Sequence, residues 1–500
     1  MDDLAAKRGG FMLSRRAFLL NSAASVATGL LPERASAVER APTILKLQRR
    51  SIDVMGKPAS VYAIRQPDGA AGFAADVGAH FRVRVENEIG EPSLIHWHGL
   101  TPPSAQDGVP GLSGPPIPPG DSADYDFPLP FGGSYFMHSH YGFQEQQLMA
   151  APLILRDPKR YPDDQEVVVM LADFSFKPPQ EIYASLTGGK GSMGHMGGME
   201  MGHAGMNHAA MANMPASETI TPKKDAARMG KPDLNDVDYD AFLANERALD
   251  DPQIVRIEKG GRILLRVINS AAMSAFHIDL GEREGTLVAV DGQDIAPVSG
   301  QSFPIAVGQR LDLLIQAPKD ARPLPVFFVL EGERRRTGLI LAPRQAPIPR
   351  LPDMADAASP ALDLALEGQL RAMSPLAARQ ADRVVPIDLT GDMASYVWSI
   401  NNVVWDPQTS PIPLKSGERV ELAMTNRTMM SHPMHLHGHR FQVVEIDGRR
   451  FDGALRDTVL VPPGKRVVVA FDADNPGHWA FHCHLLYHAQ AGMFASFKYS

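Results

Sequence analysis

The chain has 500 residues, enough for roughly two to four domains, and 44% of them are hydrophobic, which excludes a disordered polymer. The formal net charge is −8 and no basic stripe with interleaved aromatic residues occurs, which argues against a nucleic-acid partner. A single cysteine excludes an intrachain disulfide, so stability must come from packing and bound metal. With 43 glycines and 42 prolines, the composition favours an all-β chain with many turns.

Residues 1–37 have the features of a twin-arginine signal peptide. Arg15-Arg16 precedes an apolar run that continues to about Leu31, and Ala35-Ser36-Ala37 is a suitable cleavage site. The run is too short and too rich in Ala and Ser to span a membrane, and no other stretch is long enough, so stable membrane insertion is not expected. We therefore predict export to the periplasm, in the folded state, by the twin-arginine machinery.

Three similar blocks of short strands follow, over residues 41–158, 159–345 and 385–500. Residues 81–87 alternate between apolar and polar, as a half-buried strand does. Each block has such a strand ending in Asn, followed later by a short phrase ending in Gly. These phrases are Pro118-Pro119-Gly120, Ala306-Val307-Gly308 and Pro462-Pro463-Gly464. The pattern predicts one Greek-key sandwich repeated three times, with a Pro- and Ala-rich linker over 346–384 that includes a short helix around 362–373.

An insert in the second block, residues 188–215, is Gly-rich and lacks strand or helix periodicity. It contains seven methionines and three histidines. The methionines are Met193, Met196, Met199, Met201, Met206, Met211 and Met214. Because thioethers are soft ligands that suit Cu(I), we interpret the insert as an accessory Cu(I)-binding segment as well as a low-complexity one.

Ten of the 17 histidines fall in four short motifs. The motifs are His96-Trp97-His98-Gly99, His138-Ser139-His140, His432-Pro433-Met434-His435-Leu436-His437 and His482-Cys483-His484-Leu485-Leu486-Tyr487-His488. Residues i and i+2 of a strand point to one face, roughly 6–7 Å apart, so each His-x-His pair presents two imidazoles to the same side. Neutral imidazole binds copper, zinc, iron or nickel, so these pairs indicate a large metal centre.

Cys483 identifies the metal. It lies between His482 and His484, so its side chain points to the opposite face of the strand and requires a second site there. His432, His488 and Met493 complete a set of two imidazoles, a thiolate and a weak axial thioether, which is the ligand set of blue copper. Cys483 would then connect two copper sites through a few covalent bonds.

With these motifs, the sequence resembles three-domain multicopper oxidases of the laccase and bacterial copper-resistance type, over most of the mature chain. The motifs at 138–146 and 482–488 are most similar to those of periplasmic copper-resistance oxidases. The resemblance implies an all-β chain of three cupredoxin-like Greek-key sandwiches that bind four copper ions, with a three-copper cluster between the first and third domains. It implies type 1 copper on His432, Cys483, His488 and Met493, type 2 on His96 and His435, and the type 3 pair on His98, His138, His140, His437, His482 and His484.

Other residues receive roles from the same resemblance. Asp107 matches an acid that supplies protons near the cluster, whereas a second acid is missing because its place is Ala489. His488 is the expected entrance for electrons, with His432 as the alternative. Thr428 stands where cuprous oxidases carry an acid.

Four further histidines are not expected to be ligands. His277 in the middle block, together with His80 and His478, is expected to be structural, and His439 is expected to lie at the surface or to support a ligand from outside. Trp97 is expected to pack in a core.

The predicted function is oxidation of a small reductant, Cu(I) or a phenol, coupled to reduction of dioxygen to water. Three alternatives remain: a general laccase, a periplasmic protein that sequesters copper with little turnover, and a copper nitrite reductase. The last normally has two domains and lacks four His-x-His pairs.

Overall fold

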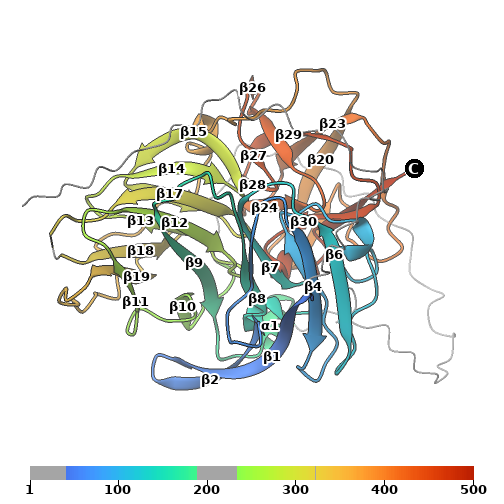
Figure 1. The fold of residues 1–500 in the computed structure, drawn as a ribbon. Coiled ribbons are helices and arrows are strands. Elements are labelled where there is room, and N and C mark those ends of the chain that lie inside the picture. Colours follow the sequence, from blue (N-terminus) through green and yellow to red (C-terminus); the bar gives the residue numbers. More distant parts are fainter. Residues whose placement is uncertain (1–40, 189–233, 321) are drawn as a thin grey trace, which may run out of the picture. The chain divides into compact units, whose positions relative to one another are not determined.

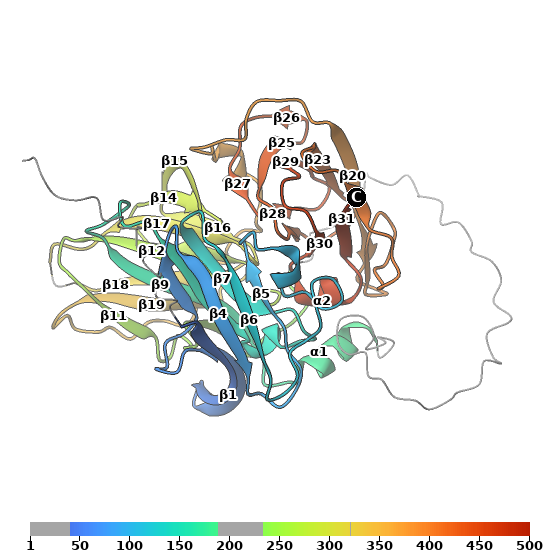
Figure 2. The same cartoon turned by 45° about the vertical axis from the view of Figure 1, so that its right-hand side comes forward.

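A computed structural model describes residues 41–188, 234–320 and 322–500 (Figures 1 and 2). The predicted signal peptide therefore lies outside the described residues, and so does the Met-rich insert except for Gly188. The described residues from 42 to 500 form one compact unit. Nearly all regular structure in it is β, as the composition predicted.

The first sandwich consists of two four-stranded sheets with strand orders β2-β1-β4-β6 and β3-β8-β7-β5. Its strands are β1 (Thr43–Val54), β2 (Lys57–Arg65), β3 (Phe73–Asp76), β4 (His80–Asn87), β5 (Ile95–His98), β6 (Ser122–Pro128), β7 (Gly133–Ser139) and β8 (Ala150–Arg156). One hydrophobic core joins both sheets, and Trp97 packs in it against Phe81, as predicted.

The second sandwich, green to yellow in Figure 1, has a six-stranded and a five-stranded sheet, with orders β10-β9-β12-β17-β14-β15 and β11-β19-β18-β13-β16. Its elements are β9 (Gln165–Phe174), α1 (Pro179–Leu186), β10 (Ala241–Ala244), β11 (Gln253–Ile257), β12 (Arg262–Asn269), β13 (Phe276–Asp279), β14 (Gly285–Val290), β15 (Gln293–Gly300), β16 (Ser302–Ile305), β17 (Arg310–Gln316), β18 (Leu324–Leu330) and β19 (Arg336–Pro343).

The third sandwich has sheet orders β21-β20-β23-β29-β25-β26, with β27 beside β25, and β22-β31-β30-β24-β28. Its elements are β20 (Arg383–Asp392), β21 (Val397–Ile400), β22 (Ile412–Leu414), β23 (Arg419–Asn426), β24 (His432–Leu436), β25 (Phe441–Ile446), β26 (Arg449–Arg450), β27 (Leu455–Arg456), β28 (Thr458–Val461), β29 (Arg466–Asp472), β30 (His478–Cys483), α2 (Leu486–Gln490) and β31 (Phe494–Tyr499). Before it, the short helix expected around 362–373 is reduced to one 3₁₀ turn at Glu367–Gln369.

The internal repeat is confirmed by equivalent hydrogen bonds in the three sandwiches. Strands β4, β12 and β23 each lie between one parallel and one antiparallel neighbour. The Asn that ends each strand donates its side-chain amide to two backbone carbonyls and accepts, at its own carbonyl, the amide of the Gly in the shared phrase. These pairs are Asn87 with Gly120, Asn269 with Gly308 and Asn426 with Gly464. The repeated Asn and Gly therefore close the same loop three times.

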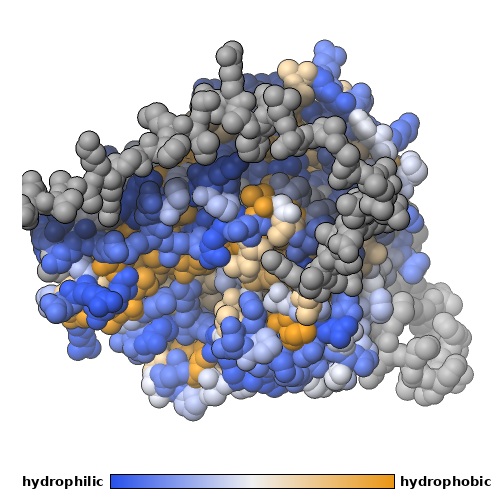
Figure 3. All heavy atoms as spheres, viewed as in Figure 1, coloured by the Kyte–Doolittle hydropathy of each residue, from blue (hydrophilic) through white to orange (hydrophobic). Residues whose placement is uncertain are grey.

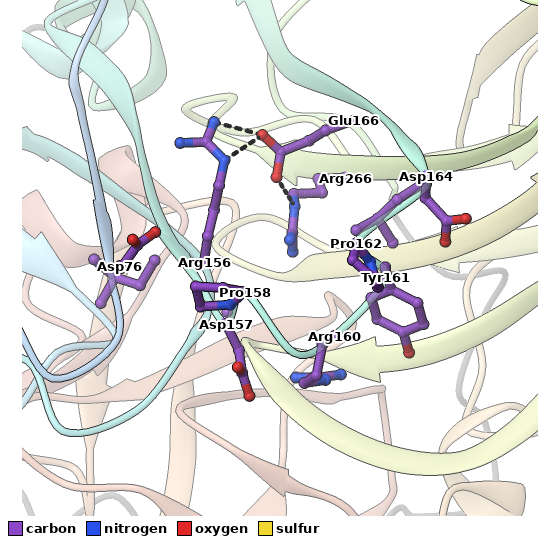
Figure 4. Close-up of a pocket in the computed structure, with 13 residues that line it drawn as sticks. Asp76, Arg156, Asp157, Pro158, Arg160, Tyr161, Pro162, Asp164, Glu166 and Arg266 are labelled. Carbon is purple, nitrogen blue, oxygen red and sulfur yellow. Dashed lines mark hydrogen bonds and ion pairs between the residues drawn. The ribbon is translucent and has the colours of Figure 1, made fainter. Parts of the chain in front are cut away.

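Ion pairs connect the first two sandwiches. In Figure 4, Arg156 of β8 and Arg266 of β12 both bind the carboxylate of Glu166 on β9. Arg266 also contacts Asp312 and the hydroxyl of Ser134 on β7. Each guanidinium therefore has an acidic partner, and the polar pocket around them is a structural junction.

The two α-helices that the structure describes are short. Within the described ranges, no helix has the length and apolar character needed to cross a bilayer. On the face shown in Figure 3, hydrophilic residues dominate and apolar ones form small separate patches.

Candidate metal centre

Four strands carry the histidine motifs, and they pair two by two. In the first sandwich, β5 and β7 are antiparallel neighbours with His96 opposite His138. In the third, β24 and β30 are antiparallel neighbours with His435 opposite His482. Because each motif has a His two residues further along the same face, both strand pairs present four imidazoles.

The eight imidazoles converge between the first and third sandwiches. Their ligand atoms form three groups, each within 4.8 Å: His96, His98 and His435; His98, His138 and His484; His140, His437 and His482. Every one of these side chains is buried. The nearest nitrogen pairs across the interface include Nε2 of His484 and Nδ1 of His98 at 3.1 Å and Nε2 of His435 and His96 at 3.4 Å.

Hydrogen bonds on the outer side of the rings fix which nitrogen faces inward. Nδ1 of His96 donates to the carbonyl of Asp107 at 2.8 Å, and Nδ1 of His437 donates to the Asp107 carboxylate at 2.8 Å. Nδ1 of His482 lies 2.8 Å from the Cys483 carbonyl. Outward donation leaves the opposite nitrogen with a free lone pair, which is the arrangement that metal ligands need.

The chemistry of these residues fits metal ions. Buried Nε2 of His138, Nε2 of His140 and Nδ1 of His484 have no hydrogen-bond partner among the described residues. Burial, together with the neighbouring imidazoles, lowers the pKa of His98, His140, His435, His437 and His484, and burial lowers the pKa of His482 to about 3. Neutral, inward-facing imidazoles without partners are costly in a dry site, and a cation removes that cost.

A second ligand set lies on the opposite face of β30. Sγ of Cys483 is 3.6 Å from Nδ1 of His432 and 3.8 Å from Nδ1 of His488, and the two nitrogens are 3.2 Å apart. Burial raises the pKa of the Cys483 thiol, so a bound cation is needed to hold the thiolate. Met493 is also buried, and its backbone pairs with both Cys483 and His488.

Known proteins share both the sequence and the fold. Sequence models described as multicopper oxidase match residues 51–160, 165–330 and 379–500. Multicopper oxidase MmcO of Mycobacterium tuberculosis is 31% identical over 85% of this chain and 80% of its own length. Copper resistance protein A of Escherichia coli is 29% identical over 83% of this chain and 86% of its own length. The chain belongs to the multicopper oxidase family.

Solved structures agree on the fold. Fet3p, a multicopper oxidase that functions in iron import, superposes with a TM-score of 0.72 at 20% identity, over 91% of this chain and 90% of that one. The laccase of Botrytis aclada superposes with a TM-score of 0.68 at 21% identity, over 91% and 88%. This multicopper oxidase is thus a copper-binding oxidoreductase with dioxygen as acceptor, built from cupredoxin-like sandwiches.

Sequence reasoning missed an acid beside the cysteine set of this oxidase. Asp236, the third described residue after the gap at 189–233, accepts a hydrogen bond from Nε2 of His488 at 2.9 Å and another from the Tyr396 hydroxyl at 2.6 Å. Trp398 stacks on the ring of His488 with a centroid distance of 4.1 Å. The sequence around Asp236 contains no motif, so only the fold brings it to His488.

A threonine contacts the other histidine of the cysteine set. The hydroxyl of Thr428 lies 2.7 Å from Nε2 of His432. Met430, two residues further on, is 3% exposed and belongs to the hydrophobic core. A neutral hydroxyl therefore orients His432, whereas a carboxylate orients His488.

The carboxylate of Asp107 contacts two histidines of the groups described above. Its Oδ2 accepts from His437, and its Oδ1 lies 3.2 Å from Nδ1 of His96. The position of the missing second acid, Ala489, lines a narrow pocket together with Glu145. Oε1 of Glu145 is 3.3 Å from Nδ1 of His138.

The other histidines that the structure describes lie outside the metal groups, and His439 is buried rather than at the surface. Nε2 of His277 is 3.0 Å from the Pro360 carbonyl, His439 bonds to the Tyr499 hydroxyl, His80 pairs with Asp126, and His478 bonds to Ser496.

Proposed function

We propose that this multicopper oxidase binds four copper ions and oxidises Cu(I) in the periplasm as part of copper tolerance. Type 1 copper would bind His432, Cys483, His488 and Met493; type 2 would bind His96 and His435; the type 3 pair would bind His98, His138, His140, His437, His482 and His484. The observation that carries the proposal is Cys483, whose thiol faces one ligand set while its two chain neighbours belong to the other.

When bound, the coppers supply one-electron oxidation of the reductant and four-electron reduction of dioxygen to two waters. The chain connects the type 1 site to the three-copper cluster, because Cys483 is covalently linked to His482 and His484 through the backbone. It also excludes water, since both ligand sets are buried. Four Cu(I) ions would be oxidised per dioxygen, with four protons consumed.

Asp107 is the proposed proton donor near the cluster. Its carboxylate is 1% exposed and touches ligand histidines from the first and third sandwiches. This places a carboxyl group on the outer side of two histidine rings whose inner nitrogens face the proposed cluster. Asp107→Asn should keep the blue absorption and the copper content but slow turnover by about 100-fold, as loss of a general acid does. Steady-state oxygen uptake measures turnover, and an absorption spectrum and copper analysis of the same sample measure the other two. Unchanged turnover would refute the role of Asp107 as proton donor.

Electrons would enter at His488. Neither His488 nor His432 is exposed, so exposure does not distinguish them, but their hydrogen-bond partners do. His488 is bonded to the carboxylate of Asp236, which attracts a cationic reductant, whereas His432 is bonded to the neutral Thr428. A negative group next to the electron entrance favours Cu(I) over a neutral phenol.

The Met-rich insert also favours Cu(I) as the reductant. Both described flanks of residues 189–233 contact the type 1 region: Asp236 bonds to His488, and the Tyr183 hydroxyl of α1 bonds to the Gln490 carbonyl of α2. Seven thioethers between these points in sequence provide soft ligands for Cu(I). The names of the relatives, copper resistance protein A among them, agree with a role in copper tolerance. Laccases among the relatives keep phenol oxidation as the second candidate.

Replacing the seven insert methionines by leucine tests the reductant. We expect Cu(I) oxidation to fall by about tenfold, equivalent to about 1.4 kcal/mol of transition-state stabilisation, because leucine keeps size and polarity but cannot bind Cu(I). Phenol oxidation should be unchanged. Oxygen uptake with each reductant gives both rates.

Met373→Leu is the control, since that methionine is 61% exposed and lies outside the insert. Equal rates for wild type and the seven-fold variant with both reductants would favour a general laccase. No oxygen uptake by fully copper-loaded wild type would favour a sequestering protein.

Asp236→Asn tests the electron entrance. The amide retains the shape of the side chain but removes the charge, so we expect kcat/KM for Cu(I) to fall about tenfold and that for a neutral phenol to change much less. Asp238→Asn is a matched control, because Asp238 is two residues away and 91% exposed. Equal losses for both reductants would contradict a charge-based role for Asp236.

A further inference from the structure

The second sandwich contributes no histidine to the cluster, but one of its arginines reaches it. Arg310, the first residue of β17, is fully buried. Its Nε donates to the Ser134 carbonyl of the first sandwich at 3.1 Å, and its Nη1 donates to the Gly308 carbonyl at 2.9 Å. Its two terminal nitrogens bind both carboxylate oxygens of Asp457, with Nη1 to Oδ1 at 2.7 Å. A single guanidinium thus contacts all three sandwiches.

Asp457 and the next residue, Thr458, hold two of the cluster histidines. Nε2 of His98 lies 3.0 Å from Oδ1 of Asp457 and 3.1 Å from the Thr458 hydroxyl. Nδ1 of His435 lies 2.9 Å from the Asp457 carbonyl and 3.1 Å from the same hydroxyl. The hydroxyl donates its own proton to Asp457 Oδ1 at 3.0 Å, so it accepts from both rings.

These contacts determine which nitrogens of the two rings remain free. With Nε2–H of His98 and Nδ1–H of His435 directed outward, Nδ1 of His98 and Nε2 of His435 face the cluster. The inward atoms lie 3.1 Å from His484 and 3.4 Å from His96, respectively. One histidine belongs to the first sandwich and the other to the third.

The local packing leaves room for this arginine. Gly99 follows the first histidine pair with φ +87°, and a Cβ there would lie 2.4 Å from Nη2 of Arg310 and 2.6 Å from Oδ2 of Asp457. The glycine of the His-Trp-His-Gly motif is therefore required by the Arg310–Asp457 pair as well as by its backbone angle.

Further buried charges surround the pair. Asp291 lies 3.7 Å from Nη1 of Arg310 and 3.1 Å from Nε of Arg456, and Arg456 also pairs with Glu367 at 3.3 Å. A buried charge network contributes little net stability compared with apolar packing, because desolvation of the ions opposes their attraction. Its position against two cluster histidines instead indicates a role in orienting them.

We propose that Arg310 is a positioning residue for the three-copper cluster: by fixing the carboxylate of Asp457 with both ends of its guanidinium, it orients His98 and His435 for copper binding. The second sandwich thereby controls a cluster to which it gives no ligand. This inference depends on the copper assignment proposed above.

The test compares Arg310→Gln with Arg266→Gln. Arg266 is also buried, lies on the neighbouring strand β12 and contacts the same residue, Ser134, but it has no contact with the cluster. For Arg310→Gln we expect normal blue absorption but at least a tenfold weaker hold on cluster copper, as loss of an outer hydrogen-bond partner typically causes. Copper per chain after graded chelation, and the type 2 electron paramagnetic resonance signal, measure this. Arg266→Gln should lower Tm and leave both readouts as in wild type.

Two further variants keep the test decisive if Arg310→Gln does not fold. Arg310→Lys keeps the charge without the two-pronged contact, and Thr458→Val removes only the shared hydroxyl; both should weaken cluster copper and spare the blue absorption. Wild-type retention of cluster copper in all folded variants would overturn the inference, and so would equal losses for Arg266→Gln and Arg310→Gln. Failure of wild type to bind four coppers would instead refute the proposed function.

Discussion

Cys483→Ser should yield a colourless protein whose oxidase turnover is at least about 1,000-fold lower, a loss equivalent to about 4 kcal/mol of transition-state stabilisation. The serine hydroxyl is a harder ligand than thiolate and does not produce the blue copper centre. The three-copper cluster should still fill, because the substitution leaves His482 and His484 in place. The backbone hydrogen bonds of this residue should also be kept, because its amide donates to the Met493 carbonyl and its carbonyl accepts from His482. Absorption spectra, copper analysis and oxygen uptake measure the three expectations.

Met493→Leu is the matched control for this loss. Both side chains are fully buried in the same ligand set, but the thioether is expected to be a weak axial ligand, so leucine should retain the blue absorption and turnover within about tenfold. A blue and active Cys483→Ser protein would overturn the assignment of Cys483. A colourless variant that has also lost its cluster copper would show that Cys483 is needed for copper binding in the cluster as well as for its connection to the type 1 site.

The parts predicted from sequence are those encoded by short-range periodicity. Alternation along a strand predicts that His96 and His98 share a face, and that Cys483 faces away from its neighbours, without knowledge of the fold. The repeated Asn and Gly likewise predict one sandwich three times, because each pair closes the same loop. Local patterns of this kind can be recognised in the sequence because the backbone geometry of a strand is fixed.

The residues that orient the ligands could not be predicted in this way. Asp236, Arg310 and Asp457 act on histidines far from them in sequence: 252 residues separate Asp236 from His488, and 359 separate Asp457 from His98. Such contacts depend on how the sandwiches pack, which no local pattern encodes. One signal was nevertheless present in Arg310-Leu311-Asp312-Leu313-Leu314-Ile315, where charges interrupt an apolar strand. A buried charge in such a strand requires a partner, and here the partners lie at sandwich junctions.

The copper-free protein should lose stability steeply below about pH 6.5. Burial lowers the pKa of seven proposed ligand histidines from the ordinary value of 6.5; they are His98, His140, His432, His435, His437, His482 and His484. Below 6.5 the unfolded chain binds protons that the folded chain excludes, so stability is retained above that pH and lost as pH falls toward the folded values, about 3 for His482. Each histidine contributes about 1.4 kcal/mol per pH unit, so seven give at most about 10 kcal/mol per unit, comparable to the stability of a whole domain.

Denaturant unfolding of the copper-free protein between pH 7.5 and pH 5, from about 1 unit above to about 1.5 units below the ordinary histidine pKa, measures this dependence. Its slope against pH gives the number of protons taken up on unfolding, and His98→Gln should reduce that number by about one. The copper-loaded protein is the control, because copper occupies the same nitrogens and binds only the folded state, which moves the loss to lower pH. A copper-free protein whose stability is constant from pH 7.5 to pH 5 would mean that the imidazoles are already protonated or hydrated in the fold. The dry, neutral site that makes these histidines suitable copper ligands would then be excluded.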